Sequence, residues 1–128
     1  MKLLLDTQLL LWTAGVSEKL PAKARAELES PENEPYLSIA SLWEMAIKRG
    51  QRRRDFVVDV RVLRRRLLDN GYMELGISSE HAMMVENLPP IHKDPFDRLL
   101  VAQAMAEGFT FLTTDATLAK YPGSIRLV

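Results

Sequence analysis

Residues 94–113 read Asp-Pro-Phe-Asp-Arg-Leu-Leu-Val-Ala-Gln-Ala-Met-Ala-Glu-Gly-Phe-Thr-Phe-Leu-Thr, and they hold the clearest structural signal in the chain. Asp94 is a good N-cap, Pro95 suits the first helical position, and Gly108 is a typical helix stop, so we predict a helix between them. Phe109–Thr113 is rich in aromatic and β-branched residues and predicts a strand. A helix followed at once by a strand is the repeating unit of an α/β fold.

The same alternation extends in both directions from this stretch. Further strands are predicted at Leu3–Leu5, Tyr36–Ser38, Tyr72–Ile77 and Ile125–Val128. Further helices are predicted at Gln8–Ala14, Pro21–Glu29, from Ser38 or Ser41 onward (Ser41-Leu42-Trp43-Glu44 matches a capping box), Asp55–Asn70 and Ser79–Asn87, with a loop between Pro31 and Pro35. Strands alternating with helices pair in parallel. We therefore expect one domain, residues 1–128, with a three-layer α/β/α architecture and a central, mainly parallel sheet of about four to five strands.

The composition narrows the class of protein. The chain has 128 residues, 47% of them hydrophobic, which is typical of a globular domain rather than a disordered chain. It contains no cysteine, which excludes a disulfide scaffold, a thiolate zinc site and a thiol nucleophile. The apolar run Leu3–Leu5 ends at Asp6, too early for a secretory signal, and no run reaches the roughly 18 residues that span a bilayer. We expect a cytoplasmic protein with no membrane segment.

Two acidic residues lie just after the ends of predicted strands. Asp6 comes after Leu3–Leu5, and Asp115 comes two residues after Phe109–Thr113. Parallel sheets bind ligands at the carboxyl ends of their strands, which is where both side chains would lie. Each has a simpler explanation as a helix cap. The position after two separate strands favours a shared site.

Two further acids, Glu44 and Asp97, fall in the opening turns of predicted helices. Asp97 alone could simply complement a helix N-terminus, and Glu44 with Lys48 forms an i,i+4 pair common on surfaces. A helical wheel gives this helix an apolar face with Glu44 at its border, and its members are Ile39, Trp43, Ala46 and Ile47. We therefore expect Glu44 to point along the sheet edge rather than into open solvent.

Carboxylates gathered within a few ångströms repel one another, and a divalent cation relieves that repulsion. Oxygen ligands without cysteine favour a hard ion, Mg²⁺ or Mn²⁺. Such an ion suits phosphodiester hydrolysis because it lowers the pKa of a bound water and stabilises charge on phosphate oxygens. The acids therefore predict metal-assisted hydrolysis.

Four segments carry a resemblance to a known family: Leu4-Leu5-Asp6-Thr7, Ser38-Ile39-Ala40-Ser41-Leu42-Trp43-Glu44, His92 to Ala104 with its Asp-Pro-Phe-Asp-Arg-Leu-Leu core, and Leu112-Thr113-Thr114-Asp115. In this order they resemble the PIN domain, and more narrowly the VapC-type toxins of type II toxin–antitoxin systems. The resemblance implies a Mg²⁺-dependent endoribonuclease that cleaves RNA, with Asp6, Glu44, Asp97 and Asp115 as its catalytic and metal-binding acids. It implies a cognate antitoxin and a homodimer as well.

Within that family pattern the acids have graded roles. The positions of Asp6 and Asp97 are the ones most often assigned to the metal, with Glu44 and Asp115 completing the charge. Thr113 stands where the family often has a hydroxyl and is expected to support the site by hydrogen bonding. We expect Asp94 to be a supporting N-cap rather than a ligand.

Two other functions compete with this one, and a structural domain that only binds metal is a third alternative that the sequence leaves open. A non-catalytic PIN-like module would bind RNA or a partner only, but degenerate members are expected to lose acids and this chain keeps all four. A phosphatase with an aspartyl nucleophile of the haloacid dehalogenase type needs a second acid two residues after Asp6, where this chain has Gln8. The endoribonuclease is the better interpretation.

The charge is unevenly distributed. The 17 basic and 17 acidic residues cancel, which argues against coating nucleic acid by bulk charge. Lys48–Arg66, however, holds nine cations against two acids, a net +7, and leaves −7 on the rest of the chain. On the predicted helix Arg61 and Arg65 point almost directly away from the apolar side, with Arg64 and Arg66 at its flanks. They form either a solvated face or an RNA backbone track, and the sequence favours neither.

The remaining distinctive side chains have quieter interpretations. We expect structural roles for His81 and His92 rather than metal binding, with a phosphate contact as the alternative for His92. Tryptophans 12 and 43 should fill the core or an interface rather than stack on bases. If the family resemblance holds, the interface surfaces include Leu9, Leu10, Trp12 and the Pro21–Glu29 helix.

Overall fold

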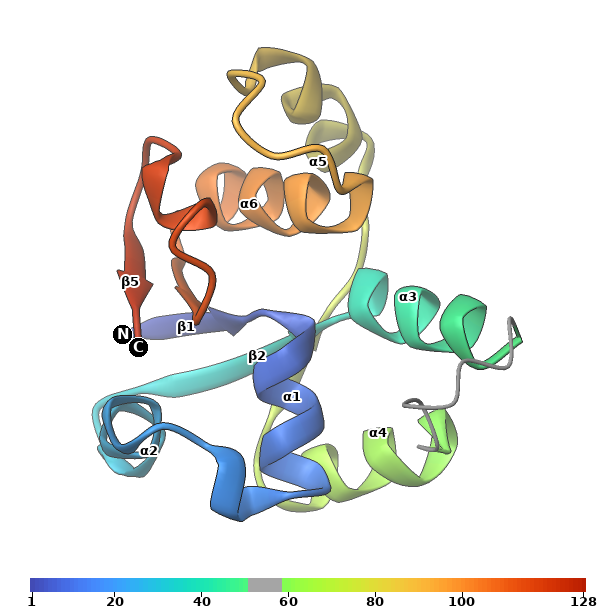
Figure 1. Cartoon of the computed structure of the whole chain (residues 1–128), viewed down its shortest axis with the longest axis vertical. Helices are drawn as coiled ribbons and strands as arrows, with labels where there is room; N and C mark the ends of the chain where they lie inside the picture. The colour runs from blue at the N-terminus through green and yellow to red at the C-terminus, as the bar shows by residue number, and fades with distance from the viewer. Residues whose placement is uncertain (51–58) are drawn as a thin grey trace.

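The structure is a computed structural model that describes residues 1–50 and 59–128 (Figure 1). The strands are β1 (Lys2–Leu5), β2 (Glu34–Ser38), β3 (Met73–Leu75), β4 (Thr110–Thr113) and β5 (Ile125–Leu127). The α-helices are α1 (Thr7–Ala14), α2 (Ala22–Glu29), α3 (Ile39–Gly50), α4 (Val60–Asp69), α5 (Ser79–Met84) and α6 (Pro95–Glu107). Short 3₁₀ turns cover Ser17–Lys19, Val85–Asn87 and Leu118–Lys120. Among these described helices none is long and apolar enough to cross a membrane.

The five described strands form one parallel sheet in the order β3-β2-β1-β4-β5. Leu4 in the central strand pairs with Tyr36 of β2 on one side and with Phe111 of β4 on the other. The chain therefore builds outward from β1 to β3, returns, and continues on the far side of β1 with β4 and β5. This reversal beside β1 is the place where parallel sheets open a crevice at their carboxyl ends.

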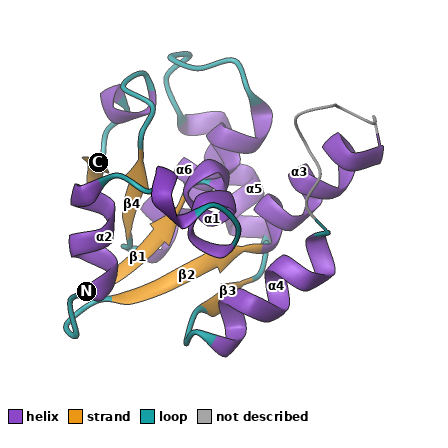
Figure 2. Ribbon diagram, turned by 60° about the horizontal axis from the view of Figure 1, so that its bottom comes forward, coloured by secondary structure: helices purple, strands orange, loops and turns teal. Residues whose placement is uncertain are grey.

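Helices cover both faces of the sheet, which confirms the predicted α/β class with three layers. Figures 1 and 2 show α1, α2 and α4 on one side and α5 and α6 on the other. Alternate side chains of a strand point to opposite faces, so Leu3 and Leu5 enter the core under α1, α2 and α4, whereas Leu4 enters the core under α6. All three leucines are fully buried, which accounts for the continuous apolar run in the sequence.

Most element boundaries lie within one or two residues of the predictions, and the larger differences concern α4, β2 and the buried face of α3. In the described residues α4 begins at Val60, because the Asp59 side chain accepts the N–H groups of Arg61 and Val62 and so caps the helix. The earlier part of the predicted Asp55–Asn70 helix, Phe56 included, lies outside the described residues. Pro35, predicted to lie in a loop, pairs with Leu3 inside β2.

Helix α3 begins after Ser38, the first of the two predicted starts, and departs from the prediction in the face that it buries. It begins at Ile39, with the Ser38 hydroxyl accepting the Ala40 N–H at 3.0 Å, so no capping box forms at Ser41. The predicted apolar face is largely outward: Trp43 is 53% exposed, and its ring meets Phe96 edge-on at 4.8 Å. The buried side chains are instead Ala40, Ser41, Glu44 and Met45. A wheel locates an apolar face without telling whether that face meets the core, and here polar side chains face inward.

Candidate functional site

All four predicted acids line one cavity of about 260 Å³ beside the ends of β1 and β4. Three helices, α1, α3 and α6, bring their first turns or neighbouring residues to the same place. The lining is mostly polar and includes Asp6, Thr7, Glu44, Lys48, Asp94, Asp97, Thr114 and Asp115. The chain thus gathers side chains from both ends of the sequence around one small space.

Asp6 is both a helix cap and a cavity residue. Its Oδ1 accepts the Leu9 N–H at 2.9 Å, which starts α1, and its Oδ2 accepts the Thr113 hydroxyl at 2.6 Å. Burial raises the pKa of this carboxyl, while the hydrogen bonds from Thr113 and Leu9 work in the opposite direction. Capping and site roles, treated as alternatives from the sequence, therefore coexist in one side chain.

Glu44 is 3% exposed, so its pair with Lys48 is not the surface device that the i,i+4 spacing suggested. Its Oε1 accepts the Thr7 hydroxyl at 2.7 Å, and its Oε2 lies 2.6 Å from Lys48 Nζ. The Thr7 hydroxyl oxygen also lies 2.9 Å from the Ser41 hydroxyl, from which it can accept a hydrogen bond. Glu44 is thus held rigidly at the wall of the cavity by groups from two helices.

Asp94 and Asp97 lie together at the start of α6. Oδ1 of Asp94 accepts the N–H groups of Phe96 at 2.8 Å and of Asp97 at 3.2 Å, so the predicted N-cap is present. Burial is the largest cause that raises the pKa of Asp97 to about 7, and the negative charges of Asp94, Glu44 and Asp6 contribute to this value against the opposing effect of His92. The ionised form of Asp97 is therefore strongly disfavoured, and a nearby cation would stabilise it.

His92 lies beside two of the site acids. The sequence analysis predicted a structural role for this residue and did not predict these contacts. Its Nε2 lies 3.1 Å from Asp115 Oδ2 and 3.7 Å from Asp97 Oδ2, and ligand-type atoms of these three residues fall within 4.8 Å of one another. Asp6 and Glu44 line the same cavity outside this tight group. The signal in the sequence was the position of His92 two residues before the N-cap of α6.

His81 has the structural role that the sequence favoured. Its ring Nδ1 accepts the Ser78 N–H at 3.1 Å, and its Nε2 lies 2.7 Å from Glu107 Oε1. The side chain is buried between α5 and α6, and it does not line the acidic cavity.

The basic residues of α4 divide into two kinds. Arg61 and Arg65 are exposed, as predicted. Arg64 makes a two-pronged ion pair with Glu74, with Nε to Oε1 at 2.8 Å and Nη2 to Oε2 at 3.1 Å, an acid that is distant in sequence. Arg52, Arg53 and Arg54 lie outside the described residues.

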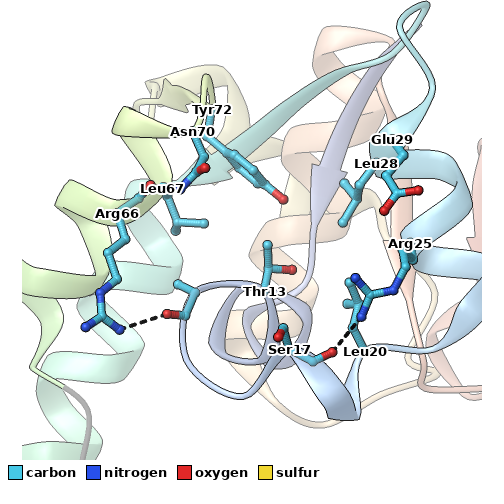
Figure 3. Close-up of a pocket in the computed structure, with 11 residues that line it drawn as sticks. Thr13, Ser17, Leu20, Arg25, Leu28, Glu29, Arg66, Leu67, Asn70 and Tyr72 are labelled. Atoms are coloured by element: carbon cyan, nitrogen blue, oxygen red, sulfur yellow. Dashed lines mark hydrogen bonds between the residues drawn. The ribbon is translucent and has the colours of Figure 1, made fainter.

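A second pocket, of about 240 Å³, lies between α1, α2 and α4 (Figure 3). The hydroxyl of Tyr72 points toward it but is buried and makes no hydrogen bond among the described residues, and burial raises its pKa to about 12 against the opposing effect of the nearby Thr13 hydroxyl. Arg25 and Arg66 stand at the rim, each bonded to a backbone carbonyl.

Leu9 and Leu10 of α1 were predicted as interface residues. Both are fully buried in the core and therefore cannot contact a partner.

The acidic cavity fits a hard divalent cation by the chemistry of its donors. Its potential ligands are carboxylate oxygens, which Mg²⁺ and Mn²⁺ prefer. The raised pKa values of Asp6 and Asp97 reflect buried charge without a counter-ion, and a cation would remove part of that cost. Lys48 supplies one positive charge at the wall, but it is engaged by Glu44.

Comparisons with known proteins agree with this arrangement. The model of the PIN domain matches residues 3–124. Solved structures with a similar fold include a chain of VapBC2 from Rickettsia felis bound to a DNA fragment from their promoter, at 15% identity with 98% of each chain covered and a TM-score of 0.72. A toxin-antitoxin complex from Klebsiella pneumoniae gives 20% identity over 96% of this chain and 94% of that one, with a TM-score of 0.61. FitAcB from Neisseria gonorrhoeae gives 16% identity over 96% and 95%, also at 0.61.

No curated protein matches this chain in sequence. The structural likenesses lie at 20% identity or lower and therefore show the fold. The match to the domain model covers residues 3–124, which is nearly all of the sequence. This chain belongs to the PIN-domain family.

Proposed function

We propose that this chain is a Mg²⁺-dependent endoribonuclease, the toxin of a type II toxin–antitoxin module of the VapC kind. One observation carries the proposal: four carboxylates from four separate segments line a single cavity at the carboxyl end of a parallel sheet. Membership of a family whose members are typically nucleases supports the reaction class, and the toxin–antitoxin complexes among similar structures support the module. The whole activity would reside in one domain acting in the cytoplasm.

The residues divide the work at the site. Asp6 and Asp97 would hold the ion, Mg²⁺ or alternatively Mn²⁺, with Glu44 and Asp115 completing the negative charge. When bound, the ion supplies a water of lowered pKa and stabilises charge on the phosphate oxygens. Thr113 fixes the Asp6 carboxylate by its 2.6 Å hydrogen bond, and Asp94 fixes Asp97 by capping α6. The site is thus held in place before any ligand enters, which is how protein dipoles contribute to catalysis.

The RNA would approach over α4. Arg61 and Arg65 are exposed on that helix and are the cations we propose for backbone phosphates. Arg64 was predicted with them, but its bidentate pair with Glu74 gives it a structural partner, so we assign it a smaller share. Phosphate contacts position an RNA without reading its sequence.

Two partner surfaces follow from the exposed features. The pocket between α1, α2 and α4 has leucine walls with Arg25 and Arg66 beside them, which suits a segment of the antitoxin. The outward side of α3 exposes Ile39 and Trp43 beside Phe96, an apolar surface that suits a second copy of the chain. Trp12 and α2 remain candidates for contact, whereas Leu9 and Leu10 are excluded by their burial.

The test is RNA cleavage by purified chain, with total RNA as substrate because the target is unidentified. We expect cleavage in Mg²⁺, none in EDTA, and a loss of at least about 100-fold in Asp6→Asn and Asp97→Asn, since outer hydrogen-bond partners of a metal already cost 10–100-fold. Asp69→Asn, an exposed acid at the end of α4, is the matched control and should cleave as wild type. RNA binding without cleavage would instead favour the non-catalytic module.

A further inference from the structure

The two ring nitrogens of His92 meet groups of opposite kind. Nδ1 lies 3.1 Å from the backbone nitrogen of Asp94, and Nε2 lies 3.1 Å from Oδ2 of Asp115. A backbone N–H can only donate a hydrogen bond, and an ionised carboxylate can only accept one. The chemistry of these two neighbours therefore determines where the proton of the ring lies.

Nδ1 must present its lone pair to the Asp94 N–H and so carries no proton. The single proton of the neutral ring is then on Nε2, and it is directed at Asp115 Oδ2. This fixes the direction of the contact: His92 donates and Asp115 accepts.

The same reasoning bears on metal binding, because His92, Asp97 and Asp115 have the spacing of a metal-binding group. A histidine binds a metal through a nitrogen lone pair, and only Nε2 faces the acids. Freeing that lone pair would move the proton to Nδ1, where it would oppose the Asp94 N–H at 3.1 Å. Ligation by His92 would therefore cost a hydrogen bond at the N-cap of α6.

The ring is held from its backbone as well. The His92 N–H donates to the Tyr121 hydroxyl at 2.8 Å, and Tyr121, which is 4% exposed, also accepts Arg98 Nη1 at 3.0 Å. The same Arg98 nitrogen donates to the Pro89 carbonyl at 3.0 Å. The loop that carries His92 is thus tied to α6 and to the turn before β5, which leaves the ring little freedom to turn.

Asp115 in turn is held at both oxygens. Oδ1 accepts the Thr117 N–H at 2.8 Å, and Oδ2 accepts His92 Nε2–H at 3.1 Å. We propose that His92 is a positioning residue: its Nε2–H orients the Asp115 carboxylate beside Asp97, and His92 is not itself a metal ligand. The consequence for RNA cleavage rests on the proposed function, whereas the hydrogen-bond arrangement does not.

The first test locates the ring protons by long-range ¹H–¹⁵N NMR, without metal and after addition of Mg²⁺. His81, whose Nδ1 accepts the Ser78 N–H, is an internal reference outside the site and completes the chain's pair of histidines. We expect both rings to carry the proton on Nε2 and the His92 pattern to persist in Mg²⁺. A proton on Nδ1 of His92, or its appearance there when Mg²⁺ is added, would overturn the proposal.

The second test separates the two nitrogens by substitution. His92→Asn keeps an acceptor for the Asp94 N–H and loses the donor to Asp115, whereas His92→Gln keeps a donor at the position of Nε2. We expect Mn²⁺ binding, measured by calorimetry, to weaken about 10-fold in His92→Asn and to be largely restored in His92→Gln, because oriented outer partners contribute about that much. In RNA cleavage, kcat should fall in His92→Asn with KM for RNA unchanged.

Asp97→Asn is the reference for loss of a metal-binding carboxylate. Equal losses of Mn²⁺ affinity in His92→Asn, His92→Gln and Asp97→Asn would identify His92 as a ligand and overturn the positioning role. A wild-type chain that binds no Mn²⁺ would refute the proposed function, and the ring proton measured without metal would still decide the arrangement at His92.

Discussion

The hydroxyl of Thr113 lies 2.6 Å from Oδ2 of Asp6 and joins the ends of β4 and β1 by a buried hydrogen bond. The hydroxyl oxygen of Thr113 also accepts the Asp115 N–H at 3.0 Å, so Thr113 connects two of the site acids. Thr113→Val keeps the shape and removes both bonds. We expect it to lower the free energy of unfolding by about 1–3 kcal/mol, the cost of leaving buried polar groups unpaired. Urea unfolding measures this, with Thr113→Ser as the control that should stay near wild type.

The raised pKa of Asp97 predicts that stability without metal depends on pH. The group titrates near 3.8 when unfolded and at about 7 when folded, so between these values the folded state binds the extra proton. Rising pH then lowers the free energy of unfolding, by at most about 4 kcal/mol for a shift of this size, and the loss is complete above about pH 8. Urea unfolding in EDTA across this range should show the decline, and Asp97→Asn should show much less of it. An equal decline in the variant would refute this cause.

Metal binding should reverse that loss of stability. A cation bound only by the folded state stabilises it by about 2.7 kcal/mol at 100 times its Kd. We expect Mg²⁺ to raise the thermal midpoint of the wild type near neutral pH, and to leave Asp6→Asn and Asp97→Asn almost unchanged. Asp69→Asn should respond as the wild type does. A response to Mg²⁺ of the same size in all four proteins would place the ion elsewhere.

The exposed arginines of α4 provide a test of the RNA track. Replacing Arg61 and Arg65 by glutamine removes two proposed phosphate contacts, which should reduce the slope of log affinity against log salt by about 0.7 for each contact with single-stranded RNA. A matched control changes Lys19 and Lys23, which are exposed near α2. Fluorescence anisotropy over a range of salt gives both affinity and slope. Equal slopes in the wild type and the arginine variant would show that these side chains form a solvated face.

Tyr72→Phe tests the polar floor of the second pocket. The hydroxyl is buried without a partner among the described residues, so its removal should leave the free energy of unfolding unchanged or raise it by about 1 kcal/mol. Association with the antitoxin should stay as in the wild type, because the buried hydroxyl is out of reach of a partner side chain. Unfolding and titration calorimetry separate the two effects, and a loss of stability of more than about 1 kcal/mol would mean that the hydroxyl is bonded within the chain.

The sequence was a good guide to the sheet and to the acids that follow its strands. Asp6 directly follows one apolar run, and Asp115 lies two residues after another. These positions located the carboxyl ends of β1 and β4, which meet at one edge because the strands are parallel. The signals at Asp94, Pro95 and Gly108 gave α6 its bounds, and Gly108 adopts the left-handed conformation expected of a helix stop.

Contacts that depend on tertiary packing could not be predicted from the sequence. The sequence locates an apolar side of α3 without telling which way it faces, and in the structure Trp43 points outward while Glu44 is buried against Thr7. The pairing of Arg64 with Glu74 and the approach of His92 to Asp115 join residues whose separation in sequence carries no periodic signal. Helical and strand periods report which side chains share a face, and tertiary packing decides what that face meets.

Whether this chain cleaves RNA through its acidic site is tested most directly by mapping the ends of cellular RNA after the chain is induced without an antitoxin. We expect new internal cleavage ends at defined positions with the wild type, and none with Asp97→Asn expressed to the same level and folded. The same new ends in both cultures, or intact RNA in both with a folded wild-type chain that binds Mg²⁺, would contradict it.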